Sequence, residues 1–331
     1  MKAYEIQPGV DSPVLVDRAS PSVGPGDLKV RVRATSLNYR DLMFVKNAGK
    51  LTAPRIPVSD GAGEVIAVGA GVTGFAVGDR VMASFFPGFR ELERGPRTDM
   101  RALGGELDGM LAEEVVLPAE AWVKLAPHLS FAEAATLPCA GVTAYNALFT
   151  VTTTRPGDTV LVQGTGGVST FALQLARAAG ARVIATSKSA AKADRARSLG
   201  ASDVIDYVAN PAWGQAVFAA AGHGVDVTVE VGGPSTFDQA LAATRAGGTI
   251  SLIGVLTGFR GDVDLAGVLR RNIRVAGIYV GGIPQLAAVN RAVAAWQLHP
   301  VIDRSFAFGE AAQAYRHLAS GAHFGKVVIE I

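Results

Sequence analysis

The sequence predicts an α/β fold in which a doubly wound parallel sheet is joined to a second, mostly β domain. Apolar strands and helical stretches alternate from about residue 126 to 282, as in βαβ units. Short strands bounded by glycine turns fill residues 1 to about 125. The tail, 283–331, ends in an apolar strand that we expect to return to the β domain. A chain of 331 residues is long enough for these two domains.

The β domain is predicted from the strict alternation of apolar and basic residues in one of its strands and from glycines beside the others. Leu28, Val30 and Val32 lie on one face of a strand over 28–33, and basic residues occupy the other face. Strands over 63–68 and 79–83 follow, each next to glycine. The segment 84–108 is polar and rich in glycine, so it is predicted to be a surface loop.

The parallel sheet is predicted from six apolar runs. Segments with apolar residues at helical spacing lie between most of these runs, and Ser235 is expected to be the N-cap of one helix. Right-handed crossovers then produce a doubly wound sheet. Two further helices are expected near 284–297 and 309–320, before a last strand over 326–331. The six predicted strands are 159–163, 182–186, 203–206, 225–230, 249–253 and 273–278.

A glycine turn between the first of these strands and its helix predicts a dinucleotide site of the Rossmann type. Gly164, Gly166 and Gly167 open the helix, whose N-terminus would meet a pyrophosphate with free N–H groups and the positive end of its dipole. Ser169 stands where a third glycine is usual, and it is small enough for close packing of helix on strand. The alternative is a glycine turn in some other α/β fold.

The residues after the second strand of the unit favour NADP(H) over NAD(H). No acidic residue lies between Gly164 and Ala193, where an NAD enzyme places a carboxylate on the ribose 2′-hydroxyl. Ser187, Lys188 and Lys192 lie there instead, and hydroxyl and ammonium groups would bind a 2′-phosphate. The alternative for both lysines is a solvated helix start.

The order of several motifs resembles the medium-chain dehydrogenase/reductase superfamily over essentially the whole chain. Several pieces in the right order are more specific than any one of them. They are Ser36-Leu-Asn-Tyr-Arg-Asp41, Gly61-Ala-Gly-Glu-Val65, Gly78-Asp-Arg-Val81, the segment 137–145, the glycine turn and Gly325-Lys-Val-Val328.

Relatives with a catalytic zinc hold it through Cys, a His-Glu pair and a second Cys or His. The matching positions here are Asn38, Ser59-Asp60 and Cys139, and one thiol with a carboxylate does not make a three-ligand zinc site. The lobe that carries four cysteines for a structural zinc matches 84–108, which has none. No metal is therefore expected. The chain resembles the zinc-independent quinone oxidoreductase, or zeta-crystallin-like, branch, and its first domain is expected to be GroES-like.

This resemblance assigns roles residue by residue. Asn38 would lie near the nicotinamide and Thr143 near its ribose. Gly166, Gly167 and Val168 would cover the pyrophosphate, with Gly164 in the same turn. The 2′-phosphate would be bound by Ser187, Lys188, Lys192 and Tyr207. The nicotinamide pocket would be lined by Ile253, Gly254 and Val255. Related enone reductases often carry a tyrosine a short distance after this asparagine. The corresponding position here lies near Gly49 and has no tyrosine.

The function expected from these residues is hydride transfer from NADPH to a quinone or another conjugated carbonyl. Asn38 and Tyr39 are the candidate catalytic hydrogen-bond donors. Asp41 and Asp60 are candidate acid/base groups, and the alternative for both is an ionised carboxylate with a structural role. A quinone suits a site without a strong acid, because its reduced ring stabilises the charge. The alternatives are an NADP-dependent alcohol or aldehyde dehydrogenase and a non-catalytic NADPH-binding sensor or structural protein.

Composition limits partners and compartment. The net charge is +2 and the basic residues are scattered, so no nucleic acid partner is expected. No run of about 18 apolar residues and no signal peptide is evident, so a membrane is not expected either. The single cysteine, Cys139, favours a cytoplasmic protein. The strand over 273–278 would leave an apolar sheet edge, which predicts a homodimer.

Overall fold

The computed structural model describes residues 1–91, 95 and 98–331, which form two compact units. The first contains Met1–Val142 and Gly281–Ile331, and the second contains Thr143–Val280. The sequence placed the boundaries near residues 125 and 282. Residues 126–142 group with the first unit because helix α2 (Phe131–Ala134) packs on strands of that unit's sheet.

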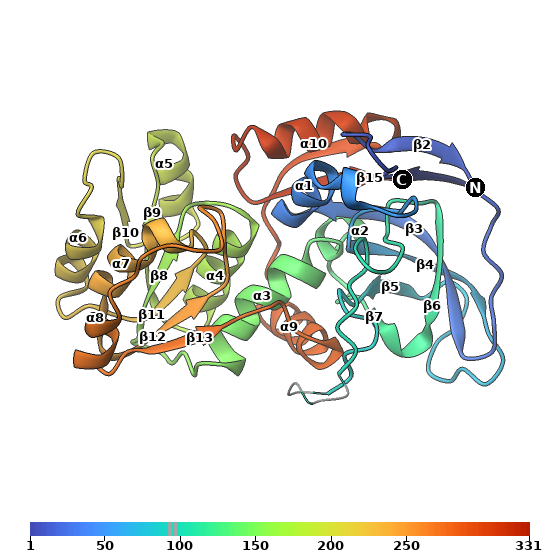
Figure 1. The fold of residues 1–331 in the computed structure, drawn as a ribbon. Helices are drawn as coiled ribbons and strands as arrows, with labels where there is room; N and C mark the ends of the chain where they lie inside the picture. The colour runs from blue at the N-terminus through green and yellow to red at the C-terminus, as the bar shows by residue number, and fades with distance from the viewer. Residues whose placement is uncertain (92–94, 96–97) are drawn as a thin grey trace. The chain divides into compact units, whose positions relative to one another are not determined.

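The second unit is built on a six-stranded parallel sheet with the order β10-β9-β8-β11-β12-β13 (Figure 1). The chain begins in the middle with β8, proceeds to one edge and then to the other, which confirms the doubly wound topology. The central strand β8 is buried at every residue, as parallel sheets covered on both faces require. The strands are β8 (Thr159–Gln163), β9 (Arg182–Thr186), β10 (Asp203–Ile205), β11 (Val225–Glu230), β12 (Thr244–Leu252) and β13 (Arg274–Gly277). The helices between them are α4 (Gly167–Ala178), α5 (Ala190–Ser198), α6 (Trp213–Ala221), α7 (Pro234–Ala243) and α8 (Leu265–Arg270).

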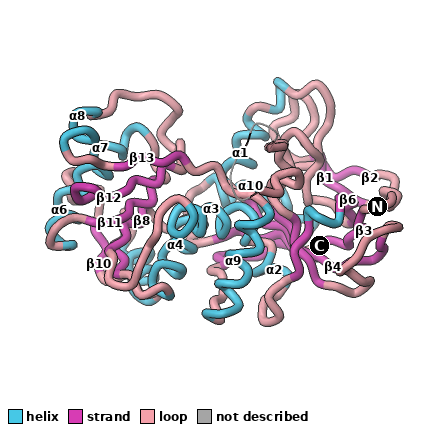
Figure 2. The backbone as a smooth tube through the Cα atoms, turned by 90° about the horizontal axis from the view of Figure 1, so that it is seen from below, coloured by secondary structure: helices cyan, strands magenta, loops and turns pink. Residues whose placement is uncertain are grey.

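The first unit is built on a seven-stranded sheet with the order β14-β15-β3-β4-β5-β7, and β6 also pairs with β3. Figure 2 shows β3, β4 and β6 of this sheet among the magenta strands. The last strand, β15, pairs antiparallel with β3, as expected for a tail that returns to this domain. The strands are β3 (Asp27–Leu37), β4 (Asp60–Val68), β5 (Arg80–Ala83), β6 (Glu114–Pro118), β7 (Trp122–Lys124), β14 (Ile302–Ala307) and β15 (Lys326–Glu330), with a separate pair of β1 (Lys2–Glu5) and β2 (Val14–Asp17). The α-helices of this unit are α1 (Tyr39–Lys46), α2, α9 (Ile283–Trp296) and α10 (Ala311–Ala319), and α3 (Val142–Tyr145) spans the boundary.

Each unit has its own apolar core. In the first, Leu28, Val30 and Val32 of β3 are buried together with residues of β15 and α10, which confirms the alternation read from the sequence. In the second, Leu161 and Ile184 of adjacent strands pack with α6 and α7. Within the described residues, no helix combines the length and the apolar character needed to cross a membrane.

Two local expectations were wrong. Helix α7 begins at Pro234 with Gly233 as its N-cap, and not at Ser235. The N–H of Ser235 in the first turn donates to Thr257 Oγ1 at 3.1 Å. The buried carboxylate of Glu230 accepts the N–H groups of Gly232 and Gly233 and the hydroxyl of Thr236, which fixes the chain where it enters the helix.

The segment 84–108 is irregular, as expected, but much of it does not lie on the surface. Phe85, Phe86, Phe89 and Leu103 are almost completely buried. The segment is polar on average, but its burial is determined by its few large apolar side chains, because each buried phenylalanine removes a large apolar area from water. Residues 92–94 and 96–97 of this segment lie outside the described part of the chain.

Candidate active site

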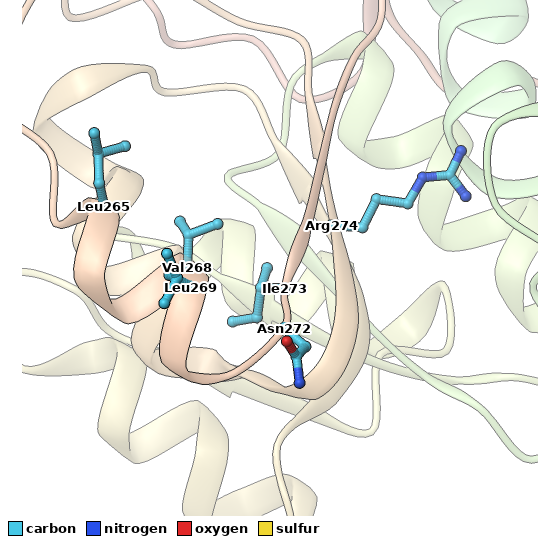
Figure 3. A pocket seen from close by; sticks show the side chains of 6 residues that line it. All are labelled: Leu265, Val268, Leu269, Asn272, Ile273 and Arg274. Carbon is cyan, nitrogen blue, oxygen red and sulfur yellow. The ribbon is translucent and has the colours of Figure 1, made fainter.

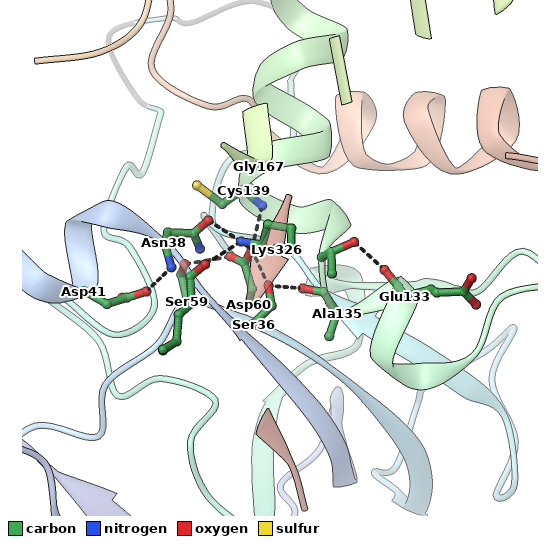
Figure 4. A network of polar contacts seen from close by, with 12 residues as sticks. Ser36, Asn38, Asp41, Ser59, Asp60, Glu133, Ala135, Cys139, Gly167 and Lys326 are labelled. Carbon is green, nitrogen blue, oxygen red and sulfur yellow. Dashed lines mark hydrogen bonds and ion pairs between the residues drawn. The ribbon is translucent and has the colours of Figure 1, made fainter. Parts of the chain in front are cut away.

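The first unit holds a buried polar cluster where β3, β4 and β15 meet (Figure 4). Strand register explains the meeting: Ser36 pairs with Asp60 across β3 and β4, and Leu37 pairs with Val327 across β3 and β15. Asn38, Asp60 and Lys326 are therefore brought together at one end of the sheet, although Asn38 and Lys326 are 288 residues apart in the chain.

Lys326 is the cation of this cluster, and its side chain is 2% exposed. Its Nζ donates hydrogen bonds to the backbone oxygen of Leu37 at 2.7 Å and to Oδ1 of Asn38 at 2.6 Å. The same Nζ lies 3.8 Å from Oδ2 of Asp60, whose side chain is fully buried. A buried charge is tolerated only when it is paired and hydrogen-bonded, and Lys326 meets both conditions.

Asp60 is held by several donors. Ser59 Oγ donates to Oδ1 at 2.7 Å, and the backbone N–H of Cys139 donates to Oδ2 at 3.2 Å. Burial raises the pKa of the Asp60 carboxyl, and the ammonium of Lys326 and the Ser59 hydroxyl oppose that rise. Asp60 is thus a fixed structural carboxylate in contact with the candidate site.

The backbone before Asp60 is strained. Val58, a β-branched residue, has φ +71° in the left-handed region, which such residues rarely adopt. It is completely buried, and its oxygen accepts the N–H of Met110 at 2.7 Å. Packing of the surrounding loop therefore fixes the direction in which Ser59 and Asp60 enter β4.

Helix α1 carries the two candidate catalytic residues at its start. Asn38 is the N-cap, and its backbone N–H donates to Oδ2 of Asp41 at 2.7 Å. Tyr39 is the first helical residue and is 47% exposed. Burial raises the pKa of Asp41 to about 6, and the nearby guanidinium of Arg40 opposes the shift. The structure joins Asn38 to Lys326, whereas Tyr39 is only about half buried and no hydrogen bond links it to this cluster among the described residues.

The residues that match zinc ligands come together but do not fit a metal. Asn38 and Asp60 already face the ammonium of Lys326, so a second cation would be repelled. Desolvation and the carboxylate of Asp60 raise the pKa of the Cys139 thiol far above its usual range, which disfavours the thiolate that zinc requires. No group of three or more His, Cys, Asp or Glu side chains suited to a metal occurs among the described residues.

In the second unit, the glycine turn has the geometry of an anion site. Gly164 has φ +68°, and Gly166 is the N-cap of the twelve-residue helix α4 without a side-chain cap. A Cβ at either glycine would meet no atom within 4 Å, so the turn leaves open space in front of the helix N-terminus. Ser169 Oγ donates to the oxygen of Gln163 at 2.7 Å, which ties α4 to the end of β8. The turn can therefore accept a pyrophosphate beside Gly167 and Val168.

The predicted 2′-phosphate residues follow β9. Ser187 is buried, and its Oγ accepts the N–H of Ser189 at 3.2 Å. Lys188 is exposed, and Lys192 lies in the first turn of α5. Tyr207 follows β10 and is 36% exposed; burial and the neighbouring Asp206 raise the pKa of its hydroxyl. Lys188 and Lys192 thus both lie at the start of α5.

The remaining predicted cofactor residues lie at two places in the second unit. Thr143 is buried in α3. Ile253 and Gly254 follow β12, and their N–H groups donate to the oxygen of Glu230 at 2.8 and 3.1 Å. A Cβ on Gly254 would lie 1.7 Å from the oxygen of Val231, so only glycine fits there. Val255 follows in the same partly exposed segment.

Comparison with known proteins identifies the class. The alcohol dehydrogenase GroES-like domain model matches residues 24–127, and the zinc-binding dehydrogenase model matches 167–295. A zinc-type alcohol dehydrogenase-like protein of Schizosaccharomyces pombe is 42% identical, with 93% of this chain and 92% of the relative covered. The chain belongs to the medium-chain dehydrogenase/reductase superfamily, and it is an oxidoreductase of that superfamily.

Solved structures agree on the fold and differ in their stated activities. A protein from Sinorhizobium meliloti 1021 has a TM-score of 0.93 at 41% identity, covering 100% of this chain and 98% of that one. An NAD-dependent alcohol dehydrogenase has a TM-score of 0.92 at 34% identity, with both chains fully covered. The quinone oxidoreductase of Coxiella burnetii has a TM-score of 0.81 at 27% identity, covering 100% and 99%. The crotonyl-CoA carboxylase/reductase AntE in complex with NADP has a TM-score of 0.86 at 24% identity, covering 100% and 94%.

Sequence reasoning missed Lys326 as a site residue. The sequence did contain a signal: Lys326 is a charged residue directly beside the apolar run Val327–Ile329, where a buried strand is expected to carry apolar side chains. A charged side chain at the start of a buried strand needs an ionic partner, and the carboxylate of Asp60 could have been considered for that role.

Asp41 gives a pH prediction. Its pKa of about 6 exceeds the unfolded value of 3.8, so the folded state binds more protons between these values and loses stability as the pH rises through that window. We expect Asp41→Asn, which keeps the cap acceptor, to remove this loss of about 3 kcal/mol. Chemical unfolding from pH 3.5 to 7.5 measures it.

The control is Asp203→Asn. The hydrogen bond from Arg182 lowers the pKa of Asp203 from 3.8, so this carboxyl is ionised in both the folded and the unfolded state above about pH 5, and the difference between the variant and wild type should be constant from there to pH 7.5. A difference between Asp41→Asn and wild type that does not change with pH would contradict the raised pKa.

Proposed function

We propose that the protein is a zinc-independent oxidoreductase that transfers hydride from NADPH to a quinone or another conjugated carbonyl. The observation that supports this most is the Lys326–Asp60 pair beside Asn38, because Asn38 and Asp60 match metal-ligand positions of zinc-dependent relatives and both face an ammonium instead. When bound, NADPH supplies the hydride; the protein binds it, orients the acceptor and offers donors to the acceptor oxygen.

The acceptor class follows from the donors available. Asn38 offers an amide, and Tyr39 a hydroxyl that is partly in solvent. A simple ketone needs strong stabilisation of its developing alkoxide, whereas a quinone or enone spreads that charge over its own conjugated system. Quinone oxidoreductase and crotonyl-CoA reductases among the structural and sequence neighbours support an acceptor of this kind.

The cofactor preference rests on the residues after β9. Lys188 and Lys192 with Ser187 offer positive charge and hydroxyl groups, and no carboxylate lies between Gly164 and Ala193. AntE, which is similar in fold, binds NADP, whereas a 34% identical neighbour is NAD-dependent. We infer NADPH from this chain's own residues.

A second candidate is an NADP-dependent alcohol or aldehyde dehydrogenase, which the names of the Schizosaccharomyces pombe relative and the alcohol dehydrogenase structure favour. A third is a protein that binds NADPH without turnover. We also infer a cytoplasmic location from the single cysteine.

The deciding experiment has two arms. In the first, purified protein is mixed with NADPH and either 1,4-benzoquinone or an enone. In the second, it is mixed with NADP and a primary alcohol. We expect loss of NADPH absorbance with quinone or enone, equal before and after EDTA treatment. Stoichiometric zinc with alcohol oxidation would establish the second candidate. Tight NADPH binding without turnover over the whole panel would establish the third.

The cofactor preference has its own test. We expect the Lys188→Ala/Lys192→Ala variant to weaken NADPH binding by about 10-fold or more, since charged hydrogen bonds are worth about 1.5–3 kcal/mol, and to leave NADH binding unchanged. Calorimetry with both nucleotides measures this. Arg197→Ala is the matched control, because Arg197 lies on the same helix and pairs with Asp194 at 2.8 Å. Tighter NADH than NADPH binding by wild type would refute the preference.

We further propose a homodimer through the edge of the parallel sheet. Strand β13 pairs only with β12 within the described residues, and Val275 on it is 39% exposed. Beside it, α8 and the start of β13 line an open hollow of about 510 Å³, where Leu265 and Leu269 are 71% and 77% exposed (Figure 3). An apolar edge of this kind is suited to a second copy of the chain.

Light scattering should therefore give twice the 34.2 kDa of the chain. Val275→Lys places a charge on the edge and should shift the protein to monomer, whereas Val208→Lys, at a position 64% exposed elsewhere in the same unit, should not. A monomeric wild type would refute this assembly.

A further inference from the structure

Three buried polar side chains of the first unit each have an oxygen without a hydrogen-bond partner among the described residues. They are Thr35 on β3, Asp41 on α1 and Tyr315 on α10, which are 0%, 1% and 5% exposed. The oxygens concerned are the Thr35 hydroxyl, Oδ1 of Asp41 and the Tyr315 hydroxyl. A buried polar atom that stays unpaired is costly, so each of these oxygens needs a partner from outside the chain.

Packing brings the three side chains to one region of the unit. Helix α10 packs on β15 and β3, and α1 packs against α10 (Figure 1). Tyr315 shares an apolar core with Ile329 of β15, and Leu42, which follows Asp41 on α1, packs against the same core. Thr35 pairs with Ile329 across β3 and β15, and opposite residues of an antiparallel pair point to the same face. All three side chains therefore belong to the layer between the sheet and these two helices.

Tyr315 and Asp41 influence each other without a direct hydrogen bond. Burial raises the pKa of the Tyr315 hydroxyl well above its usual value, and the carboxylate of Asp41 adds to that rise. The phenol therefore keeps its proton and remains a donor. Its oxygen and Oδ1 of Asp41 are nevertheless unpartnered in the described part of the chain. A polar pair that interacts across more than hydrogen-bond distance has the spacing that a bridging water fills.

The helix cap prevents the Asp41 carboxylate from closing this gap. Its Oδ2 accepts the backbone N–H of Asn38 at 2.7 Å, which fixes the carboxylate at the start of α1. Rotation of the side chain toward Tyr315 would break that bond and leave an N–H of the first turn unpaired. Oδ1 is thus held with free lone pairs inside the protein.

We propose that one buried water molecule binds between Asp41 and Tyr315, with Thr35 as its third partner. The water accepts the O–H of Tyr315 and donates one hydrogen to Oδ1 of Asp41 and the other to the Thr35 hydroxyl oxygen. About three hydrogen bonds of this kind are the usual number for a buried water. The site joins β3, α1 and α10, and it does not depend on which acceptor the protein reduces.

A neutral ligand fits the charges at this site better than a metal cation does. The guanidinium of Arg40 and the ammonium of Lys326 both stabilise the ionised carboxyl of Asp41, against its burial. A further cation would be repelled by both of these groups. Water also supplies both donors and an acceptor, whereas a cation could not accept the O–H of Tyr315.

A high-resolution crystal structure of the full chain tests the site directly. We expect a density peak about 2.8 Å from Oδ1 of Asp41, from the Tyr315 hydroxyl and from the Thr35 hydroxyl. Crystals soaked in rubidium chloride should show no anomalous signal at that peak. An anomalous peak would identify a monovalent cation and overturn the proposal. Absence of any peak, or a direct hydrogen bond between Tyr315 and Asp41, would overturn it as well.

A double-mutant cycle tests the shared water in solution. Tyr315→Phe and Thr35→Val each remove one hydroxyl and keep most of the side-chain shape, and we expect each to lower the folding equilibrium constant by about 5-fold. The combined variant should lose at least about 3-fold less than the product of the two losses, because both hydroxyls bind one water. Chemical unfolding at fixed pH measures these constants. Purely multiplicative losses would overturn the shared site.

Tyr4→Phe is the matched control for this cycle. Tyr4 is a buried tyrosine of the same apolar core, but its hydroxyl already has a partner in the backbone of Ala311. Its loss combined with Thr35→Val should therefore be multiplicative to within about 2-fold. Equal coupling of Thr35 to Tyr4 and to Tyr315 would show a general response of the core and would overturn the water bridge.

Discussion

The buried pair of Lys326 and Asp60 is the interaction on which the first unit's site depends. It joins the last strand to the two strands that carry Asn38 and Asp60, and it does so without solvent. Replacing such a pair with apolar residues is often neutral for stability, whereas removing one partner is costly. The pair therefore contributes more to geometry than to stability, since Lys326 also holds the side-chain oxygen of Asn38.

The second unit uses a neutral amide and a carboxylate in a comparable way. Gln163, the last residue of β8, donates to the buried Glu230 at the end of β11, and its oxygen accepts the N–H groups of Val231 and Gly232. Glu230 in turn binds the start of α7. These contacts fix the loops that follow two adjacent strands, at the edge where ligands of doubly wound sheets bind.

Much of the second unit could be predicted from sequence. Strands β8, β9 and β11 have the predicted bounds, because each is short and rich in β-branched residues. The glycine turn was found for the same reason, since its residues are contiguous. The N-cap of α7 could not be found, because a local pattern favours Ser235, whereas Gly233 precedes the helix and the distant Thr257 accepts the N–H of Ser235.

The first unit was less accessible to sequence reasoning. Its polar cluster is made of residues that only strand register brings together. The lysine that begins an apolar strand, Lys326, indicates in the sequence that a buried partner is needed, but only the register identifies that partner as Asp60. The strain at Val58 also has no sequence signal, because valine predicts an extended backbone. The burial of Phe85 and Phe86 was hidden by the glycines and charges around them. The roles of the individual site residues remain predictions.

The wide sequence separation within the polar cluster has a consequence for biosynthesis. Asn38 leaves the ribosome long before Lys326, 288 residues later, and domains tend to fold as they emerge. Until then β3 lacks its β15 neighbour and exposes an unpaired edge, and Asp60 has no cation. The nucleotide-binding unit, whose residues are contiguous, can fold first. Nascent chains would thus acquire a cofactor-binding surface before they acquire a competent reaction centre.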